Sequence, residues 1–380
     1  AVSVAAATAT GLDAPLVVTQ LPRQNKPPAA PEAGSLVRAD WFDGARLVLV
    51  SPDGRLHPLA GDFHSACDPN ISFDGLRVLF AGKKQRSDSW RVWEMNLDGG
   101  QLRAVSPENL DARSPIHVST LFTLDSPEPW FTMVFVARVP ILSELGRPSA
   151  SSLYNVKLDG TELRQLTFNP NHNLDPFQMW DGRVIYSAER YPNQPGGPAG
   201  QVGLYAIHIE GADMELYGAR QAKRIRQMPC ATEDGLVVFV ESDQPTGDGA
   251  GQLACVREQR PHVTYQPLTT DPAFVFLHPS PLGGGRLLAA RRESLDSGNY
   301  AIISFDYSRR LIQPVFDTPE HHEVQAVLAA PRRRPDGHST VVETKFDYGT
   351  FYGLNAYDAE ARIAPHLSTG MVKRVRLIEG

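Results

Sequence analysis

Apolar and polar residues alternate over short stretches of this chain, and turn residues separate the stretches. Within residues 67–106, four such runs follow one another, at 70–73, 76–81, 90–97 and 102–106. Alternation with a period of two is typical of a β-strand that buries one face. Asp74-Gly75 and Asp98-Gly99 are tight-turn dipeptides, because glycine adopts positive φ without steric cost. The region predicts a four-stranded antiparallel sheet that opens at Asp68-Pro69.

This order of strands and turns recurs along the chain. Residues 153–167 repeat the third strand, the Asp-Gly turn and the fourth strand, and residues 175–187 repeat the Asp-Pro opening and the first two strands. Weaker copies lie at 45–60, 230–241 and 271–291. A repeat of about 50 positions lies in the range of β-propeller blades.

The amino-terminal copy, residues 12–60, lacks its first strand. Residues 324–330 alternate suitably and would supply that strand, which closes the ring with strands from both chain ends and limits exposed sheet edges. We therefore predict an all-β, six-bladed propeller. Its blades would be 12–60 with 319–331, then 61–108, 109–170, 171–220, 221–270 and 271–318. A seven-bladed alternative would add a partial blade from residues 339–344 and 350–357.

The predicted domain organisation is a flexible tail at 1–11, the propeller at 12–335 and a carboxyl-terminal extension at 336–380 that could contact a partner. Residues 372–378 of this extension alternate like one more strand. The start of the chain, residues 1–16, is small, apolar and nearly uncharged, and it resembles what remains after a signal peptide is removed. We expect a periplasmic or extracellular protein, with a disordered cytoplasmic tail as the alternative.

Composition narrows the functional classes. The 380 residues include 42% hydrophobic residues, 31 Gly and 31 Pro, which suit a turn-rich β protein. No apolar run is long enough to span a bilayer. The net charge of −6 and the lack of a basic stripe with interleaved aromatic residues argue against a nucleic-acid partner. The G-x-S-x-G, P-loop and H-E-x-x-H motifs are absent from the sequence.

The start of each innermost strand should face the central channel of a propeller. The residues predicted to line it are Cys67, Asp68, His117, His172, Asp175, Cys230 and Asp271, and those predicted to bind zinc or manganese are His278, His321 and His322. Imidazole, thiolate and carboxylate groups are the usual ligands of these metals. The alternative is structural, since Asp before Pro often accepts backbone N–H bonds and Cys is often a small buried residue.

The repeated sequence motifs DP, FDG, LDG and LRQLT resemble those of TolB-type six-bladed propellers. Residues 67–80 (CDPNISFDGLRVLF), 90–103 (WRVWEMNLDGGQLR) and 369–380 (TGMVKRVRLIEG) resemble most the propeller region of hydrazine synthase alpha-subunit-like proteins. In that family, the propeller is joined to haem-binding c-type domains, and the chemistry occurs at a haem beside a zinc site. Covalent haem needs a C-x-x-C-H motif, and this sequence contains none. We therefore expect no haem-binding residues and no covalent haem on this chain.

Two functional hypotheses follow from the resemblance. In the first, the chain is a non-catalytic, protein-binding subunit of a periplasmic redox assembly for electron transfer, and it packs against a c-type cytochrome partner. In the second, the chain is a metal-dependent enzyme, either hydrazine synthase-like or a lyase, with a His-lined site at the channel. We favour the first, because the missing haem motif removes the chemistry of the family while the propeller pattern remains.

Overall fold

The structure, a computed structural model, describes residues 10–33, 35–123, 126–139, 150–191, 200–218, 223–294, 298–340, 342, 355, 357 and 364–374. The chain divides into two compact units, Ala1–Ser339 and Thr340–Gly380. Most of the predicted tail at 1–11, most of the optional seventh blade at 339–344 and 350–357, and residues 375–378 of the predicted last strand lie outside the described residues. In the described part of the second unit, the 3-10 helix Ala364–His366 is the regular element.

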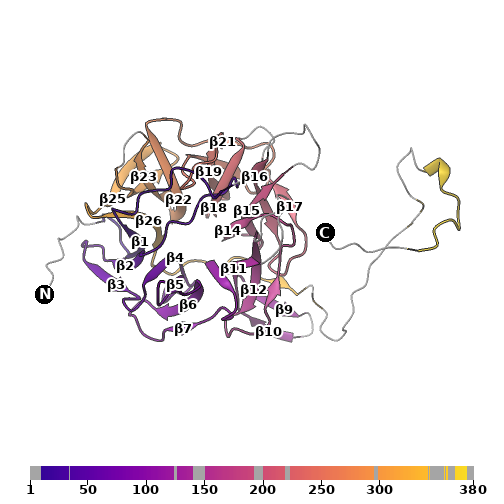
Figure 1. The fold of residues 1–380 in the computed structure, drawn as a ribbon, viewed down its shortest axis with the longest axis horizontal. Helices are drawn as coiled ribbons and strands as arrows, with labels where there is room; N and C mark the ends of the chain where they lie inside the picture. The colour runs from indigo at the N-terminus through magenta and orange to yellow at the C-terminus, as the bar shows by residue number, and fades with distance from the viewer. Residues whose placement is uncertain are drawn as a thin grey trace. The chain divides into compact units, whose positions relative to one another are not determined.

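The first unit consists of β-sheets that follow one another around a common centre (Figure 1). The first sheet contains β26 (His321–Leu328), β1 (Leu16–Pro22), β2 (Arg46–Val50) and β3 (Leu56–Leu59). The second contains β4 (Ser65–Ile71), β5 (Arg77–Lys83), β6 (Arg91–Asn96) and β7 (Arg103–Ala104). The third contains β8 (Asp111–His117), β11 (Thr132–Val139), β12 (Ala150–Lys157) and β13 (Arg164–Gln165).

Two more groups of four strands are joined into one eight-stranded sheet by a single parallel pairing, Val202 with Ile225. One group contains β14 (Asn173–Gln178), β15 (Val184–Arg190), β16 (Gln201–Ile207) and β17 (Glu215–Tyr217). The other contains β18 (Ile225–Ala231), β19 (Leu236–Ser242), β20 (Gln252–Arg257) and β21 (Gln266–Pro267). The last four-stranded sheet contains β22 (Phe274–Gly283), β23 (Arg286–Glu293), β24 (Ala301–Asp306) and β25 (Leu311–Phe316). A small sheet of β9 (Leu121–Thr123), β10 (Ser126–Trp130) and β27 (His338–Ser339) stands beside them.

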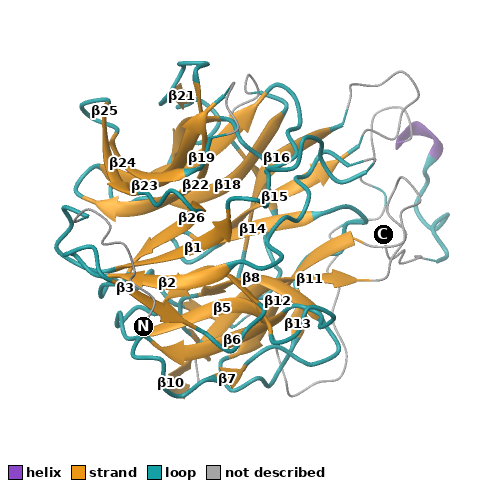
Figure 2. Cartoon of the chain, turned by 60° about the vertical axis from the view of Figure 1, so that its left-hand side comes forward, coloured by secondary structure: helices purple, strands orange, loops and turns teal. Residues whose placement is uncertain are grey.

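The innermost strands form a closed ring. In the order β4, β8, β14, β18, β22 and β26, each strand contacts the next, and β26 contacts β4. Figure 2 shows the antiparallel strands of each group running beside one another. The predicted closure is confirmed, because β26 from the carboxyl-terminal side pairs with β1 over Leu16–Leu328 to Pro22–His321. Apolar side chains fill the space between neighbouring sheets, as Val17 and Leu47 of the first sheet do against Val78 and Phe80 of the second.

Each innermost strand carries a β-bulge at a residue with positive φ. These residues are Asp68 (56°), Ser114 (49°), Asp175 (55°), Met228 (53°), His278 (48°) and Gln325 (53°). The register shifts between the innermost and second strands occur at the same places. Proline follows five of the six residues, which a bulge tolerates because the hydrogen-bond ladder is already interrupted there.

The bulge corrects one prediction. Asp68-Pro69 was predicted to open its strand, but the strand runs over Ser65–Ile71 and the dipeptide lies in its middle. Proline has no N–H to donate to the hydrogen-bond ladder, but the bulge already leaves this position of the strand unpaired. Among the described residues, no helix has the length and apolar character required to cross a membrane.

Glu323 lies on β26, the strand that closes the ring, and is fully buried. Its burial predicts that the stability of the protein depends on pH. Its Oε1 accepts hydrogen bonds from Thr318 Oγ1 (2.5 Å) and Gln20 Nε2 (3.0 Å), and burial raises its pKa to about 8. The folded protein holds a proton that the unfolded chain releases at a lower pH. The stability from this group is therefore present below the unfolded pKa of about 4.3 and is lost as the pH rises through the folded pKa.

We expect Glu323→Gln to flatten the fall in unfolding free energy between about pH 5 and pH 8, by at most about 1.4 kcal/mol per pH unit. Urea unfolding at several pH values measures this change. Glu320→Gln, at an exposed position three residues earlier, is the matched control and should keep the slope of the parent protein. Equal slopes for all three proteins would contradict the assignment of a neutral, buried Glu323.

Candidate functional site

The six bulge residues surround a central cavity of about 130 Å³. The prolines that follow five of them also line it, so the channel wall is built from the same dipeptide position in each sheet. Three of the predicted site residues lie here, namely Asp68, Asp175 and His278. The bulge residues Ser114, Met228 and Gln325 were not predicted, although proline after the first two was a signal in the sequence.

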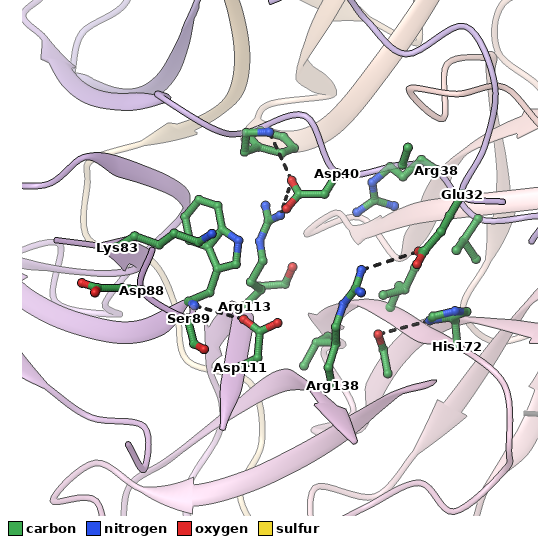
Figure 3. Close-up of a pocket in the computed structure, with 18 residues that line it drawn as sticks. Glu32, Arg38, Asp40, Lys83, Asp88, Ser89, Asp111, Arg113, Arg138 and His172 are labelled. Atoms are coloured by element: carbon green, nitrogen blue, oxygen red, sulfur yellow. Dashed lines mark hydrogen bonds and ion pairs between the residues drawn. The ribbon is translucent and has the colours of Figure 1, made fainter. Parts of the chain in front are cut away.

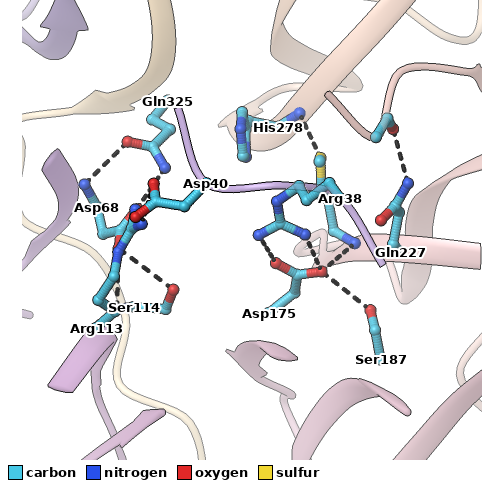
Figure 4. A network of polar contacts seen from close by, with 12 residues as sticks. Arg38, Asp40, Asp68, Arg113, Ser114, Asp175, Ser187, Gln227, His278 and Gln325 are labelled. Carbon is cyan, nitrogen blue, oxygen red and sulfur yellow. Dashed lines mark hydrogen bonds and ion pairs between the residues drawn. The ribbon is translucent and has the colours of Figure 1, made fainter. Parts of the chain in front are cut away.

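Side chains of the bulge residues bind the backbone of the next innermost strand. Gln325 Oε1 accepts the N–H of Asp68 (2.9 Å), and Asp68 Oδ2 accepts the N–H of Ser114 (3.0 Å). Asp175 Oδ2 accepts the N–H of Met228 (3.1 Å), and the Met228 sulfur accepts the N–H of His278 (3.4 Å). Because the bulge interrupts the ladder, these N–H groups need acceptors from elsewhere. Four of the six strand junctions are joined in this way (Figure 4).

Two arginines neutralise the channel carboxylates. Arg38 Nη1 donates to Asp175 Oδ2 at 3.0 Å, with a second bond to the other carboxylate oxygen. Arg113 Nε donates to Asp68 Oδ2 at 3.0 Å, and its Nη1 donates to Asp40 Oδ1 at 2.7 Å. Burial alone would raise the pKa of Asp68, but Arg113 and the neighbouring hydrogen bonds hold it at about 2. These carboxylates are therefore charged and paired in the folded protein.

One mouth of the channel is covered by residues 35–45, which we call the N-terminal strap. The strap carries Arg38 and Asp40 across the mouth between Asp175 and Arg113 (Figure 4). The N–H of Leu36 donates to Glu189 Oε1 (2.8 Å), and the N–H of Ala39 donates to the carbonyl oxygen of Gly247 (2.8 Å). These bonds attach the strap to two different sheets.

The opposite mouth is covered by residues 330–338, which we call the C-terminal strap. Backbone N–H groups of Arg332, Asp336 and His338 donate to the carbonyl oxygens of Phe73 (3.0 Å), Trp180 (3.4 Å) and Thr120 (3.0 Å). The approach is close enough to require glycine in the facing turns. A Cβ at Gly75 would lie 2.6 Å from the Pro331 nitrogen, and one at Gly182 would lie 2.1 Å from His338 Nε2. Both ends of the channel are thus covered by the chain itself.

A larger cavity of about 470 Å³ lies beside the N-terminal strap (Figure 3). The Arg113 guanidinium is held between the rings of Phe42 (4.8 Å) and Trp90 (4.6 Å) on one side of it. Lys83 places its ammonium 4.9 Å from the Trp90 ring. Arg138 and Glu32 form a long ion pair of 3.6 Å at the rim, and Asp111, which accepts the N–H of Trp90 (3.0 Å), also lines the cavity.

The three predicted metal ligands do not form a centre in this geometry. The N–H of Tyr300 donates to His322 Nδ1 (3.2 Å), so the neutral ring carries its proton on Nε2. A metal-bound histidine differs, because one ring nitrogen binds the metal and the other donates its N–H to an acceptor. His321 and His322 are consecutive in β26, so their side chains point to opposite faces of the sheet. His278 packs against Phe42 (6.3 Å), and burial lowers its pKa to about 4. The described ranges contain no cluster of three or more His, Cys, Asp or Glu suited to a metal ion. These residues do not fit a zinc or manganese centre.

The cysteines likewise do not fit covalent haem. Cys67, Cys230 and Cys255 are free, buried thiols within the hydrophobic core. Burial raises the pKa of all three thiols, which favours the neutral form. No two of them are spaced as a haem attachment motif requires.

The other predicted channel residues lie outside the channel wall. His117 Nδ1 is 2.9 Å from Asn70 Oδ1. His172 is buried at the larger cavity, with Nδ1 3.2 Å from Ser151 Oγ. Asp271 is exposed, and its carboxylate accepts the N–H of Ala273 (2.9 Å). These three residues therefore have structural contacts away from the channel, and Cys230 lies in the hydrophobic core. Cys67 lies beside the channel, where its sulfur accepts a hydrogen bond from Arg113 Nη2 (3.2 Å).

No protein-family model matches this sequence. Over 94% of its length, the chain is 25% identical to hydrazine synthase subunit alpha of Kuenenia stuttgartiensis, and it spans about half (52%) of that curated relative. The solved hydrazine synthase structure from Kuenenia stuttgartiensis matches with a TM-score of 0.73 and 23% identity, over 87% of this chain and 48% of that chain. TolB from Acinetobacter baumannii matches with a TM-score of 0.55 and 13% identity, over 84% of this chain and 67% of that chain. The two predicted resemblances and the propeller fold are confirmed.

Asp175→Ala tests the structural role of the channel. The substitution leaves Arg38 without its carboxylate and the Met228 N–H without its acceptor. We expect a loss of about 3 kcal/mol in the free energy of unfolding, the usual result of breaking a buried pair on one side. Asp271→Ala, at the exposed turn, should change stability by less than about 1 kcal/mol. Equal small effects of both substitutions in urea unfolding would contradict this role.

Proposed function

We propose that this chain is a non-catalytic, extracytoplasmic propeller subunit that binds a protein partner within a redox assembly. The observation that carries the proposal is that the channel is covered at both mouths by the chain's own straps. The charges on the channel wall are already paired with one another, so a substrate would have to displace these pairs.

The resemblances support the assembly role. The curated relative is, by its name, the alpha subunit of hydrazine synthase, and this chain matches about half of its length. Haem is the expected redox group of such an assembly, and the cysteines of this chain do not fit covalent haem. We therefore propose a c-type cytochrome domain or subunit as the partner. The likeness to TolB and to hydrazine synthase supports a periplasmic location.

The face that carries the N-terminal strap is the proposed contact surface. Its cavity of about 470 Å³ opens beside Lys83, whose ammonium has a ring contact but no carboxylate partner in the described ranges. Arg138 is 44% exposed and only loosely paired with Glu32. Cations backed by aromatic rings are common anchors of protein interfaces, because the ring orders the side chain before binding. An acidic side chain of the partner would fit between Lys83 and Arg138.

The first test is purification from the native source under mild conditions. We expect the protein to elute with a haem-bearing polypeptide, seen by visible absorbance and assigned by mass spectrometry. Elution of the protein alone, without haem absorbance, would contradict the cytochrome partner.

Charge reversal then locates the contact surface. Lys83→Glu combined with Arg138→Glu should weaken binding to the isolated partner by at least about tenfold, because both substitutions oppose an acidic contact. Arg286→Glu is the matched control. Arg286 is an exposed arginine at the start of β23 and does not line the cavity beside the N-terminal strap. Binding affinity can be measured by calorimetry, with circular dichroism as the folding check. Equal losses for the double variant and the control would place the contact elsewhere.

A further inference from the structure

A further cavity lies under the C-terminal strap. It has a volume of about 150 Å³ and is separate from the larger cavity at the other mouth. Most of its wall is apolar, and the residues that matter here are Ile71, Phe177, Trp180, Leu282, Val327 and Arg332. The strap that covers it is held by the backbone bonds of Arg332, Asp336 and His338. The space is therefore a formed pocket of the propeller unit.

Arg332 is the one arginine of this wall, and its charge has no carboxylate partner in the described part of the chain. Its Nη2 donates to the carbonyl oxygen of Ile71 (3.1 Å), and its guanidinium lies 4.3 Å from the ring of Phe73. Glu233 also lines the pocket, but it is exposed and makes no ion pair with Arg332. The two arginines of the channel, Arg38 and Arg113, are in contrast bound to carboxylates.

A cation in this position favours an anion beside it. Taking a guanidinium out of water is unfavourable unless it is paired, and burial lowers the pKa of Arg332 to about 10. A guanidinium has five N–H donors in a planar fork, and a carboxylate fits two of them at once. The Ile71 carbonyl occupies a single donor. The remaining donors and the apolar wall together suit a molecule with one carboxylate and a small apolar body.

We propose that the pocket under the C-terminal strap binds a small organic acid, with its carboxylate on Arg332 and its apolar part against Phe177, Trp180 and Leu282. This site is distinct from the proposed protein contact at the other mouth and does not depend on it. The simpler role for Arg332 is to anchor the strap through the Ile71 carbonyl and the Phe73 ring. The experiment below separates the two roles, because an anchor alone does not bind free acid.

Titration calorimetry with sodium benzoate, at ionic strength held constant with sodium chloride, tests the site on the full chain. We expect saturable 1:1 binding with a dissociation constant of about 1 mM or lower, and weaker binding of acetate, which lacks the apolar body. Arg332→Gln should weaken benzoate binding by at least about tenfold, because the charged fork is lost. The matched control is Arg309→Gln, at an exposed position outside the pocket whose partner is Asp306, and it should leave the affinity unchanged within about twofold.

A second variant covers the case in which Arg332→Gln fails to fold. Leu282→Phe fills part of the pocket and leaves the Arg332 guanidinium in place, so benzoate binding should be lost while the strap stays anchored. No saturable binding of benzoate to the parent protein would overturn the proposal. So would an unchanged affinity in folded Arg332→Gln or in Leu282→Phe.

Discussion

The positive-φ bulge in every innermost strand is the constraint on which the centre of this molecule depends. A bulge interrupts the hydrogen-bond ladder, so an N–H at the bulge needs an acceptor from outside the pair of strands that the ladder joins. The side chains of Gln325, Asp68, Asp175 and Met228 provide such acceptors for the next strand. The acidic acceptors in turn require Arg113 and Arg38 as counter-charges. The polar channel is therefore a consequence of how neighbouring sheets are joined, and it does not need a substrate to explain it.

The two straps make similar polar and close backbone contacts at the ends of the channel. The N-terminal strap brings Arg38 and Asp40 to the channel charges, and the C-terminal strap lies against the turns at Gly75 and Gly182. Two cavities lie next to the straps, one beside the N-terminal strap and one under the C-terminal strap. The former is lined by the half-buried Lys83 and the exposed Arg138, which suits a protein surface. The latter is small and mostly apolar, which suits a small molecule.

The sequence was sufficient to predict the sheets and their closure, because alternation and Asp-Gly turns are local signals. It was less informative for the site. His321 and His322 looked like a pair because they are adjacent, yet adjacent residues of a strand face opposite ways. The ion pairs of Arg38 with Asp175 and of Arg113 with Asp68 could not be predicted from local sequence patterns, because the two members of each pair are distant in the chain. The recurring X-Pro dipeptide could have identified Ser114 and Met228 had it been interpreted as a bulge within the strand.

Hydrogen exchange of the innermost strands is the most direct test of a closed, internally bonded channel. The amides of Asp68, Ser114 and Met228 are bound by side chains of neighbouring strands. We expect peptides that contain them to exchange only with global unfolding, and the N-terminal strap to be protected alongside them. Exchange of these peptides within seconds in the native protein would show that the channel opens readily. That result would contradict the view that its charges serve the structure alone.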